Sequence, residues 1–472
     1  MPKKKAPRSL AVVVLAAGRG KRMKSKTPKV LHPVCGRPAL WHVLRAARRL
    51  RPDRLIVVVS NERGQVEESV RSWRIKPEPV FVDQGRTLGT GHAVMVAEPA
   101  VGKVDDVVVL PGDEPLVTGE MLQALLRRHR RRQAAATAQT TVLDDPSGFG
   151  RVVREGDVFV RIIGEREATT AERRIREATT CVYGFDRAAL FGALPLVTTD
   201  NVQREYYLPD VPRILLDKGE KVLAEEADYG GTLGINSRAE LARATDVMRV
   251  RINDGHMEAG VTLVDPSRTY IDVEVRIGRD TVVLPMTLLQ GQTRIGEGCT
   301  IGPSTIVEDS RVGDGSVVEL SVVRNARIGR LASVGPYAHL RPGTVLEDRA
   351  KAGSFVEIKN ATVGRDSKVP HLSYVGDARV GRDVNIGAGT VTVNYDGYRK
   401  HRTVIEDGAR VGSDTMLVAP VRVGRGAVTG AGSVITKNVP PGALAIERSE
   451  QRNVSGYRRK KDAKAKGKGS GG

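Results

Sequence analysis

The chain has 472 residues, of which 40% are hydrophobic and only 4% aromatic, and its formal net charge is +20. This length exceeds what one core ordinarily organises, so we expect two or more domains filled mainly with aliphatic side chains. No apolar run is long enough to span a membrane, and three widely separated cysteines exclude a disulfide framework and fit a cytoplasmic protein.

The positive charge is concentrated at the two ends of the chain. Residues 1–9 include "PKKKAPR" and residues 449–472 include "RRKKDAKAKGKG". The chain shows no basic helix with interleaved aromatic residues and no recognition-helix pattern. We therefore expect a basic N-terminal extension, a disordered tail that is solvated or binds anions weakly, and no specific nucleic-acid partner.

The stretch "LAVVVLAAGRGKRMKSKTPKVL" begins at Leu10. The basic residues 1–9 before it and its apolar run could indicate a secretion signal, but the run is short and Val-rich, as in a buried parallel strand. It leads into a glycine-rich turn and a cluster of cations, which predicts a site for an anion. The alternative for this turn is a surface loop with scattered charge.

Strands and helices then alternate along the first half. The pattern predicts strands at 10–18, 54–60, 79–84 and within 104–116, and helices at 39–50 and 118–133, the second capped by Thr118. Such alternation is typical of a Rossmann-like, mostly parallel α/β sheet, which we assign to residues 10–236. Ligands bind beyond the carboxyl ends of such strands, where "GRGKR" and "PGDEPL" lie.

The rhythm changes after a charged, helix-prone linker at residues 237–260. From 261 to 448, aliphatic residues recur at multiples of six with glycine beside them, as in "IGEGCTIG" and "VGRGAV". This period is the signature of a parallel β-helix, whereas a sandwich would alternate with period two. "TVNYDGYRKHRT" is the longest expected inserted loop.

Together, "LAAGRGKRMKSKTPKVL", "LGTGHAV", "LPGDEPL", "GINSR" and "PHLSYVGDARVGRDVNIGAGTVTVNYDG" resemble a bacterial family of bifunctional enzymes. These enzymes are glucosamine-1-phosphate N-acetyltransferases and N-acetylglucosamine-1-phosphate uridyltransferases. The resemblance spans about residues 10–448. It implies a left-handed hexapeptide β-helix, a homotrimer formed through it, acetyl-CoA and UTP as substrates, Mg²⁺ as the cofactor, and a place in cell-wall precursor synthesis.

The resemblance also implies a uridyltransferase site. Mg²⁺ would be held by Asp113 and Asn236, and Arg22 and Lys29 would hold the phosphates. The UTP-binding positions are Leu15, Ala16, Ala17, Gly18, Arg22, Lys29, Gln84, Gly89, Thr90, Gly112 and Asp113. The positions for N-acetylglucosamine 1-phosphate are Gly150, Glu165, Thr179 and Asn236.

The sugar pocket departs from the family pattern. A gapless alignment places Gly164, with Glu165 beside it, where the family has Glu. It places Thr179 at an Asn position and Cys181 at a glycine position. Losing an acid and an amide removes groups that discriminate between sugars, so we expect nucleotidyl transfer with a weakened preference for the N-acetyl sugar.

For acetyl transfer, the resemblance makes His371 the general base, because the amine must lose a proton before it attacks. Glu357 could orient it or be a surface residue. The glucosamine-1-phosphate positions are Arg341, Lys359, Tyr374 and Asn385. The acetyl-CoA positions are Ala388, Asn394, Tyr395, Ser413, Ala431 and Arg448.

Two alternatives keep the architecture and change the function. One is a nucleotidyltransferase of another sugar specificity fused to a β-helix. The other is a non-catalytic scaffold of the same architecture, against which the presence of Lys29, Asp113, Asn236 and His371 argues.

Overall fold

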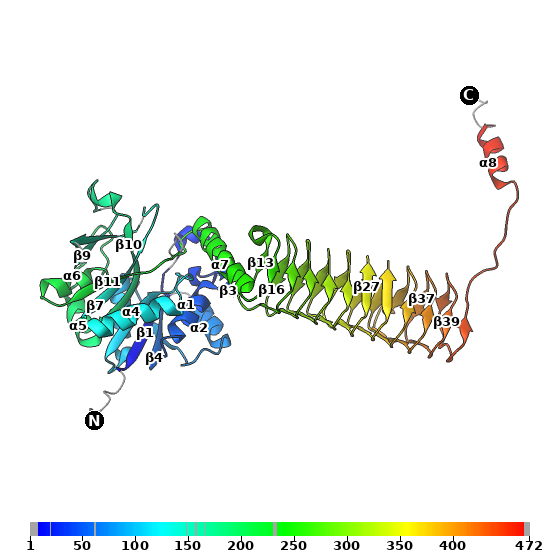
Figure 1. The fold of residues 1–472 in the computed structure, drawn as a ribbon, viewed down its shortest axis with the longest axis horizontal. Helices are drawn as coiled ribbons and strands as arrows, with labels where there is room; N and C mark the ends of the chain where they lie inside the picture. Colours follow the sequence, from blue (N-terminus) through cyan, green and yellow to red (C-terminus); the bar gives the residue numbers. More distant parts are fainter. Residues whose placement is uncertain are drawn as a thin grey trace. The chain divides into compact units, whose positions relative to one another are not determined.

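The computed structural model describes residues 8–18, 20–60, 63–147, 149–155, 158–165, 167–229 and 234–466. Most of the expected N-terminal extension, Arg19 of the predicted anion-binding turn and the last six residues lie outside these ranges. The chain forms two compact units, residues 1–255 with 271–273, and residues 256–270 with 274–472 (Figure 1). Within the described ranges, no helix combines the length and apolar composition needed to cross a bilayer.

A nine-stranded sheet organises the first unit, with the order β11-β7-β10-β6-β1-β4-β5 and with β8 and β9 attached beside β10. The strand β1 runs parallel to β4 and β6, whereas β10 runs antiparallel to β6 and β7. The strands are β1 (Leu10–Leu15), β4 (Arg54–Val59), β5 (Val80–Asp83), β6 (Asp106–Pro111), β7 (Ala136–Val142), β8 (Arg151–Glu155), β9 (Val158–Ile163), β10 (Glu177–Asp186) and β11 (Val222–Glu226).

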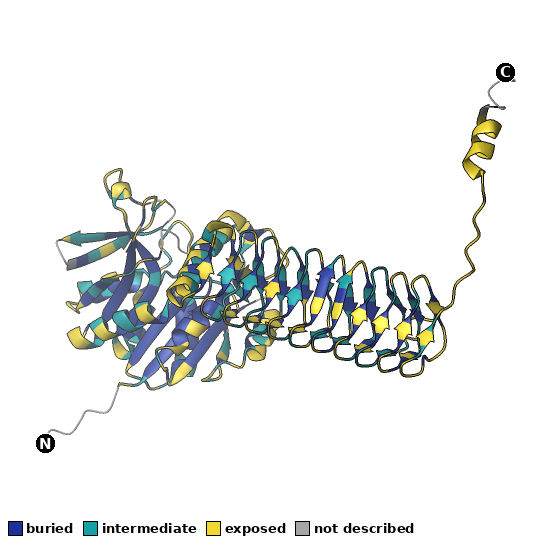
Figure 2. Cartoon of the chain, turned by 45° about the vertical axis from the view of Figure 1, so that its right-hand side comes forward, coloured by how far each residue is buried: buried dark blue, intermediate teal, exposed yellow. Residues whose placement is uncertain are grey.

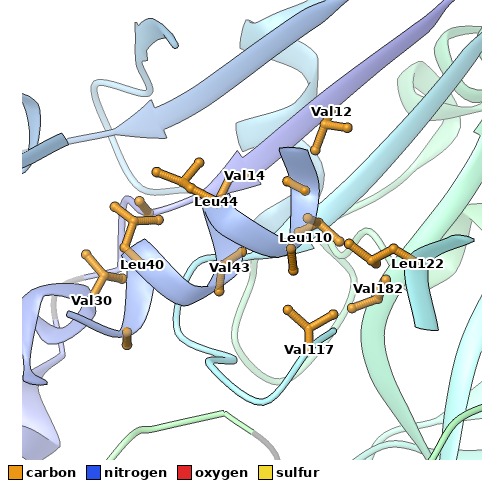
Figure 3. Packing of buried hydrophobic residues seen from close by; sticks show 14 of the residues in the cluster. Val12, Val14, Val30, Leu40, Val43, Leu44, Leu110, Val117, Leu122 and Val182 are labelled. Carbon is orange, nitrogen blue, oxygen red and sulfur yellow. The ribbon is translucent and has the colours of Figure 1, made fainter. Parts of the chain in front are cut away.

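Two hydrophobic clusters cover the two faces of this sheet. Val12 and Val14 of β1 belong to one cluster, and Val13 belongs to the other, because successive side chains point to opposite faces. Figure 3 shows Leu40 and Leu44 beside the β1 valines. The helices are α1 (Ala39–Arg48), α2 (Arg63–Ser72), α3 (Thr90–Val101), α4 (Gly119–Arg132), α5 (Arg187–Ala193), α6 (Asp210–Asp217) and α7 (Arg238–Glu258).

The predicted strands and helices of the first half are confirmed, and so is the cap of α4. The Thr118 hydroxyl accepts a hydrogen bond from the Met121 amide at 3.2 Å. The sequence reading did not include α2, α3, α5, α6 or the strands β7 to β11, among them the long antiparallel β10. The β10 strand carries polar threonines at its centre, so it lacks the Val-rich run of a buried strand.

An ion cluster fastens the start of the chain to the sheet. The Asp106 side chain, 1% exposed, lies 2.7 Å from the Arg8 guanidinium and 2.6 Å from that of Arg130. Ser9 donates to Asp105 through its amide at 2.7 Å and through its hydroxyl at 2.8 Å. Part of the basic N-terminal segment therefore has a structural role.

The second unit is a left-handed parallel β-helix whose three sheets contain 11, 10 and 9 strands. The first sheet contains β12 (Thr262–Leu263), β15 (Val282–Val283), β18 (Thr300–Ile301), β21 (Val317–Val318), β24 (Ser333–Val334), β27 (Lys351–Ser354), β30 (Lys368–His371), β33 (Asn385–Ile386), β36 (Arg410–Val411), β39 (Val428–Thr429) and β41 (Leu444–Ala445). The second contains β13 (Tyr270–Ile271), β16 (Leu288–Gln290), β19 (Ile306–Glu308), β22 (Val322–Arg324), β25 (His339–Leu340), β28 (Glu357–Lys359), β31 (Tyr374–Gly376), β34 (Val391–Val393), β37 (Met416–Val418) and β40 (Val434–Ile435). The third contains β14 (Arg276–Ile277), β17 (Arg294–Ile295), β20 (Arg311–Val312), β23 (Arg327–Ile328), β26 (Val345–Leu346), β29 (Thr362–Val363), β32 (Ala378–Val380), β35 (Thr403–Ile405) and β38 (Val421–Val423).

The six-residue aliphatic period marks the interior, as predicted. Val283, Ile301 and Val318 are fully buried and pair in register from one coil to the next. Figure 2 shows the same pattern of buried positions along the β-helix strands. The sequence reading missed a second set of interior residues, the buried threonines and serines. The Thr281 hydroxyl, for example, donates to the Gly296 carbonyl at 2.8 Å, which satisfies a polar group at a corner of the coil.

The predicted insertion occurs at residues 394–402. Thr362 pairs with Arg379, but Ala378 pairs with Thr403, so the intervening coil contains extra residues.

The tail differs from the expected disorder, because residues 457–466 form α8 (Tyr457–Lys466). Its lysines, arginines and alanines are good helix formers, and Figure 2 shows the helix exposed.

Candidate functional site

A cleft of about 600 Å³ lies at the carboxyl ends of β1 and β6. It is where a mostly parallel sheet is expected to bind its ligand. Ten of the predicted residues line it: Leu15, Ala17, Gly18, Lys29, Gln84, Gly89, Thr90, Asp113, Thr179 and Asn236.

The Lys29 ammonium joins the two predicted metal ligands. It contacts Asp113 Oδ2 and donates to Asn236 Oδ1 at 3.0 Å. The Lys29 and Asp113 side chains are 13% and 16% exposed, so the contact is largely shielded from water. The backbone amide of Asn236 donates to the Glu240 carboxylate at 2.6 Å, which positions this residue.

These two oxygens fit Mg²⁺ as a donor set. They already converge on one cation, the lysine ammonium, and carboxylate and amide oxygens are the ligands that hard cations prefer. Among the described residues, no group of three or more His, Cys, Asp or Glu side chains forms a metal site. One or two protein ligands are usual for a Mg²⁺ ion that also binds phosphates and water, and Asp113 and Asn236 would fill this role.

Gln84 lies in the wall of the cleft and is 5% exposed. Its side-chain amide donates to the Gly89 carbonyl at 2.9 Å and lies 3.3 Å from His92 Nδ1. Gly89 has φ 108°, and a Cβ there would lie 2.5 Å from the Tyr206 carbonyl oxygen. Only glycine fits this turn, which brings Gln84 and Thr90 to the cleft.

The β10 strand forms the wall at which the sequence departs from the family pattern. The Thr179 hydroxyl lies 3.2 Å from the Tyr183 hydroxyl and accepts a hydrogen bond from the Cys181 amide at 3.2 Å. Cys181 has φ 57°, within a register shift of the β10–β7 pairing. Burial, reinforced by Glu114 and Asp113, raises the pKa of the Cys181 thiol to about 12, so the thiol is neutral.

Five predicted residues do not line the cleft: Ala16, Arg22, Gly112, Gly150 and Glu165. Ala16 and Gly112 are held in the strand framework by hydrogen bonds to Val58 and Leu15. Arg22 is exposed in the short helix η1 (Lys21–Met23), where its neighbour Lys21 reaches the cleft instead.

Gly150 and Glu165 are the remaining two residues that do not line the cleft. The Gly150 carbonyl accepts a hydrogen bond from the Thr179 amide at 3.0 Å. Glu165 is 2.6 Å from the buried guanidinium of Arg151. Gly164, the expected position of the family acid, also lies outside the cleft lining.

The cleft also contains Lys21 of the predicted cation cluster, and residues that the sequence reading missed, among them Phe149, Tyr183, Glu205 and, above all, Glu114. Glu114 follows Asp113 directly and is only 6% exposed. Burial holds the pKa of its carboxyl well above the usual range, the Asp113 charge raises it further, and Lys29 opposes the shift. The only sequence signal was an acid inside the otherwise recognised motif "PGDEPL".

In the second unit, the predicted sugar-phosphate residues lie on successive coils. The Arg341 guanidinium donates to the Glu357 carboxylate at 2.6 Å, and Glu357 pairs in register with Tyr374. Lys359 lies on the same strand as Glu357, and repulsion from Lys400 of the inserted loop lowers its pKa. Cations from two coils and the loop thus gather where a phosphate is expected.

His371 ends β30 and is exposed, beside Ser354 of the preceding coil. Within the described part of the chain, its imidazole has no hydrogen-bonding partner, and Glu357 pairs with Arg341 rather than with it. Asn385 belongs to β33, the next strand of the same sheet.

The inserted loop is tied to the coil that carries Tyr374. The Asn394 side-chain amide donates to Asp377 at 2.5 Å and lies 3.4 Å from the Tyr374 hydroxyl. The Tyr395 hydroxyl donates to the Gly397 carbonyl at 2.6 Å, within the loop.

The other predicted acetyl-CoA residues form a column along later coils. The Asp414 amide donates to the Ala388 carbonyl at 2.6 Å, and the Gly432 amide donates to the Ser413 carbonyl at 2.9 Å. The Arg448 guanidinium donates to the Ala431 carbonyl at 3.1 Å. A ligand along this column would contact consecutive coils.

Comparisons with known proteins agree with these two units. The MobA-like NTP transferase domain model matches residues 12–179, and the model of the bacterial transferase hexapeptide (six repeats) matches residues 402–437. The chain is 48% identical over 452 residues to the "Bifunctional protein GlmU" of Desulfitobacterium hafniense, which covers 96% of this chain and 99% of that protein. For the proteins of the same name from Heliobacterium modesticaldum and Streptomyces avermitilis, the identity is 51% over 443 residues (93% and 96% covered) and 49% over 457 residues (96% and 94% covered).

Proposed function

The chain belongs to the bifunctional GlmU family, and from this premise we propose which residues carry out its two reactions. The protein is an N-acetyltransferase and a uridyltransferase of UDP-N-acetylglucosamine synthesis, with one activity for each matched domain type. The observation that carries the residue assignment is the convergence of Lys29, Asp113 and Asn236 in the cleft of the first unit.

For uridyl transfer, the sugar phosphate attacks the α-phosphate of UTP in line and pyrophosphate leaves, so charge is the main obstacle. The lysines that line the cleft, Lys29 and Lys21, neutralise the phosphates. Gln84 and Thr90 hold the uracil edge with donor and acceptor groups. Asp113 and Asn236 would hold Mg²⁺, which when bound neutralises phosphate charge as a Lewis acid. We also propose that the remaining predicted UTP and sugar positions, including Arg22 and Glu165, contact these substrates, and a structure with bound ligand would test this.

For acetyl transfer, His371 takes a proton from the ammonium of glucosamine 1-phosphate. The neutral amine then attacks the thioester carbon of acetyl-CoA, the N–C bond forms, the C–S bond breaks, and coenzyme A leaves as a thiol after protonation. Arg341 and Lys359 bind the sugar phosphate, and Tyr374 and Asn385 bind its hydroxyls. The column from Ala388 through Ser413 and Ala431 to Arg448, with Asn394 and Tyr395, binds acetyl-CoA.

A homotrimer is part of this proposal. Tyr337, Phe355 and Leu372 occupy the same turn of successive coils, are 55%, 58% and 63% exposed, and leave an apolar column beside His371. A neighbouring copy would cover this column and enclose the exposed imidazole.

We also place the protein in the cytoplasm, where UTP and acetyl-CoA are available.

The test is a coupled assay with acetyl-CoA, glucosamine 1-phosphate, UTP and Mg²⁺. We expect thiol release without UTP, and pyrophosphate release only when the acetylated sugar phosphate is formed or supplied. Lys29→Met should abolish pyrophosphate release alone, and His371→Ala should abolish thiol release alone. A folded protein that releases neither product would support the scaffold alternative.

A second candidate, a broader sugar specificity, is favoured by one observation. Thr179 and Cys181 stand on the cleft wall, and the Thr179 hydroxyl is already engaged by Tyr183 and the Cys181 amide. Supplying glucose 1-phosphate in place of the N-acetyl sugar tests it, with pyrophosphate release as the measurement.

A further inference from the structure

A buried acid in the nucleotidyl cleft has one oxygen without a hydrogen-bonding partner among the described residues. Glu114 lines the cleft and is 6% exposed, and within the described residues its Oε2 atom has no hydrogen-bonding partner. Burying a polar atom without a partner costs free energy, so a ligand group that hydrogen-bonds this oxygen would remove that cost. Asp113, by contrast, is already paired with Lys29.

Glu114 lies on the side of the cleft that holds the altered sugar wall. Glu114 follows β6, which pairs antiparallel with β10 in the register Val109 with Tyr183, so Cys181 lies toward the end of β6 from which Glu114 continues, and Cys181 lines the same cleft. A Cβ placed on Gly234 would lie 3.5 Å from both Glu114 Cγ and Asp113 Oδ2. Glu114 is thus close to the metal-ligand pair on one side and to the β10 wall on the other.

The β10 wall itself offers little to a sugar. The Thr179 hydroxyl is used within the protein, the Cys181 thiol is a weak donor, and Glu165 pairs with Arg151 away from the cleft. A polar substrate in this part of the cleft would leave its own N–H or O–H groups unpaired unless another residue bonded them.

We propose that Glu114 is a specificity-determining residue of the sugar subsite, where its carboxyl group hydrogen-bonds an N–H or O–H group of the sugar 1-phosphate. This proposal rests on the proposed uridyltransferase site. Glu114 supplies, from the segment that follows β6, hydrogen bonds that Gly164 and Thr179 do not supply. A sugar without the matching group leaves the buried oxygen unpaired and is rejected.

The experiment measures binding of UDP, UDP-glucose and UDP-N-acetylglucosamine to the full-length protein by calorimetry, together with its thermal midpoint. The variants are Glu114→Leu, which keeps the volume and removes the polar atoms, and Glu114→Gln, which keeps an acceptor. Glu120→Gln, an exposed acid a short distance along the chain, is the control.

We expect Glu114→Leu to bind UDP as the native protein does, within about twofold, but to lose at least about tenfold of the extra affinity for a UDP-sugar. Glu114→Gln should retain more of that affinity, and Glu120→Gln all of it. If Glu114→Leu loses affinity for both UDP-sugars, a hydroxyl that they share is the partner of Glu114. If it loses affinity for UDP-N-acetylglucosamine alone, the partner is the amide N–H of that sugar.

The thermal midpoint separates a binding role from a structural one. Removing an unpartnered buried carboxyl should raise the midpoint in Glu114→Leu, whereas removing a structural contact would lower it. The proposal would be overturned if Glu114→Leu bound UDP and the UDP-sugars more weakly by the same factor. It would also be overturned if the variant had a lower thermal midpoint and an unchanged preference for UDP-sugars over UDP. Failure of the native protein to bind any of the three ligands would overturn the proposed function instead.

Discussion

Lys29 occupies the position between the two oxygens that are proposed to bind Mg²⁺, and this leads to a counter-intuitive prediction. Its ammonium contacts both Asp113 Oδ2 and Asn236 Oδ1. A metal ion must displace that ammonium before it can bind. Lys29→Met, which keeps the stem and removes the charge, should therefore bind Mg²⁺ more tightly than the native protein when no nucleotide is present.

The structure sets the size of this effect. The two contacts are hydrogen bonds from a charged donor at a site where the lysine and aspartate are 13% and 16% exposed. A hydrogen bond to a charged group contributes about 1.5–3 kcal/mol, so loss of the contact with Asp113 alone should tighten Mg²⁺ binding by roughly 10- to 150-fold, and loss of the Asn236 contact adds to this. Affinity for UTP should fall, because the phosphates lose a cation.

Calorimetric titration with MgCl₂ and, separately, with UTP gives both affinities. Lys21→Met is the matched control, because Lys21 also lines the cleft but is exposed. Its Mg²⁺ affinity should not change. Equal Mg²⁺ affinity in the native and Lys29→Met proteins would refute the reasoning, because it would mean that Lys29 does not compete for Asp113 and Asn236.

Four further variants test the rest of the molecule. His371→Ala should lower acetyl transfer by roughly 10²–10⁴-fold and leave uridyl transfer unchanged, as thiol and pyrophosphate assays would record; near-normal thiol release at neutral pH would contradict the assignment. Deleting residues 460–472 should leave both activities unchanged at moderate salt, because the exposed helix adds nothing to a core; loss of either would show a contact with substrate or with another copy. Asp106→Asn should lower the free energy of unfolding by about 3 kcal/mol, which is the low end for breaking a buried ion pair, because water can hydrate Arg8 and Arg130. The thermal midpoint should fall by roughly 6–12 °C, and a smaller fall would mean that the cluster is dispensable. The pair Gly164→Glu plus Thr179→Asn should sharpen the preference for N-acetylglucosamine 1-phosphate over glucose 1-phosphate, measured as the ratio of kcat/KM; an unmoved ratio would show that other groups read the sugar.

The local pattern of the sequence was sufficient for the elements of both units. Val-rich runs predicted β1, β4 and β6 because a strand buried on both faces must be apolar throughout. The six-residue period predicted the β-helix because each coil must repeat the same inward positions, and Val283 and Ile301 stack as expected. The motifs identified Lys29, Asp113 and Asn236, and the fold brings all three to one cleft.

Only the tertiary structure decided how the cleft is completed. The sequence places Glu114 and Cys181 far apart, and only the packing of β10 beside β6 brings both to one cleft. It places Glu165 in a plausible sugar position, and only the structure shows that the buried Arg151 guanidinium is the partner of its carboxylate. A residue's type limits the bonds it can make, but its partners are chosen by the strands that pack against it. Short motifs therefore predicted the ligands of the nucleotide, while the unpaired carboxyl of Glu114 could be recognised only from the folded chain.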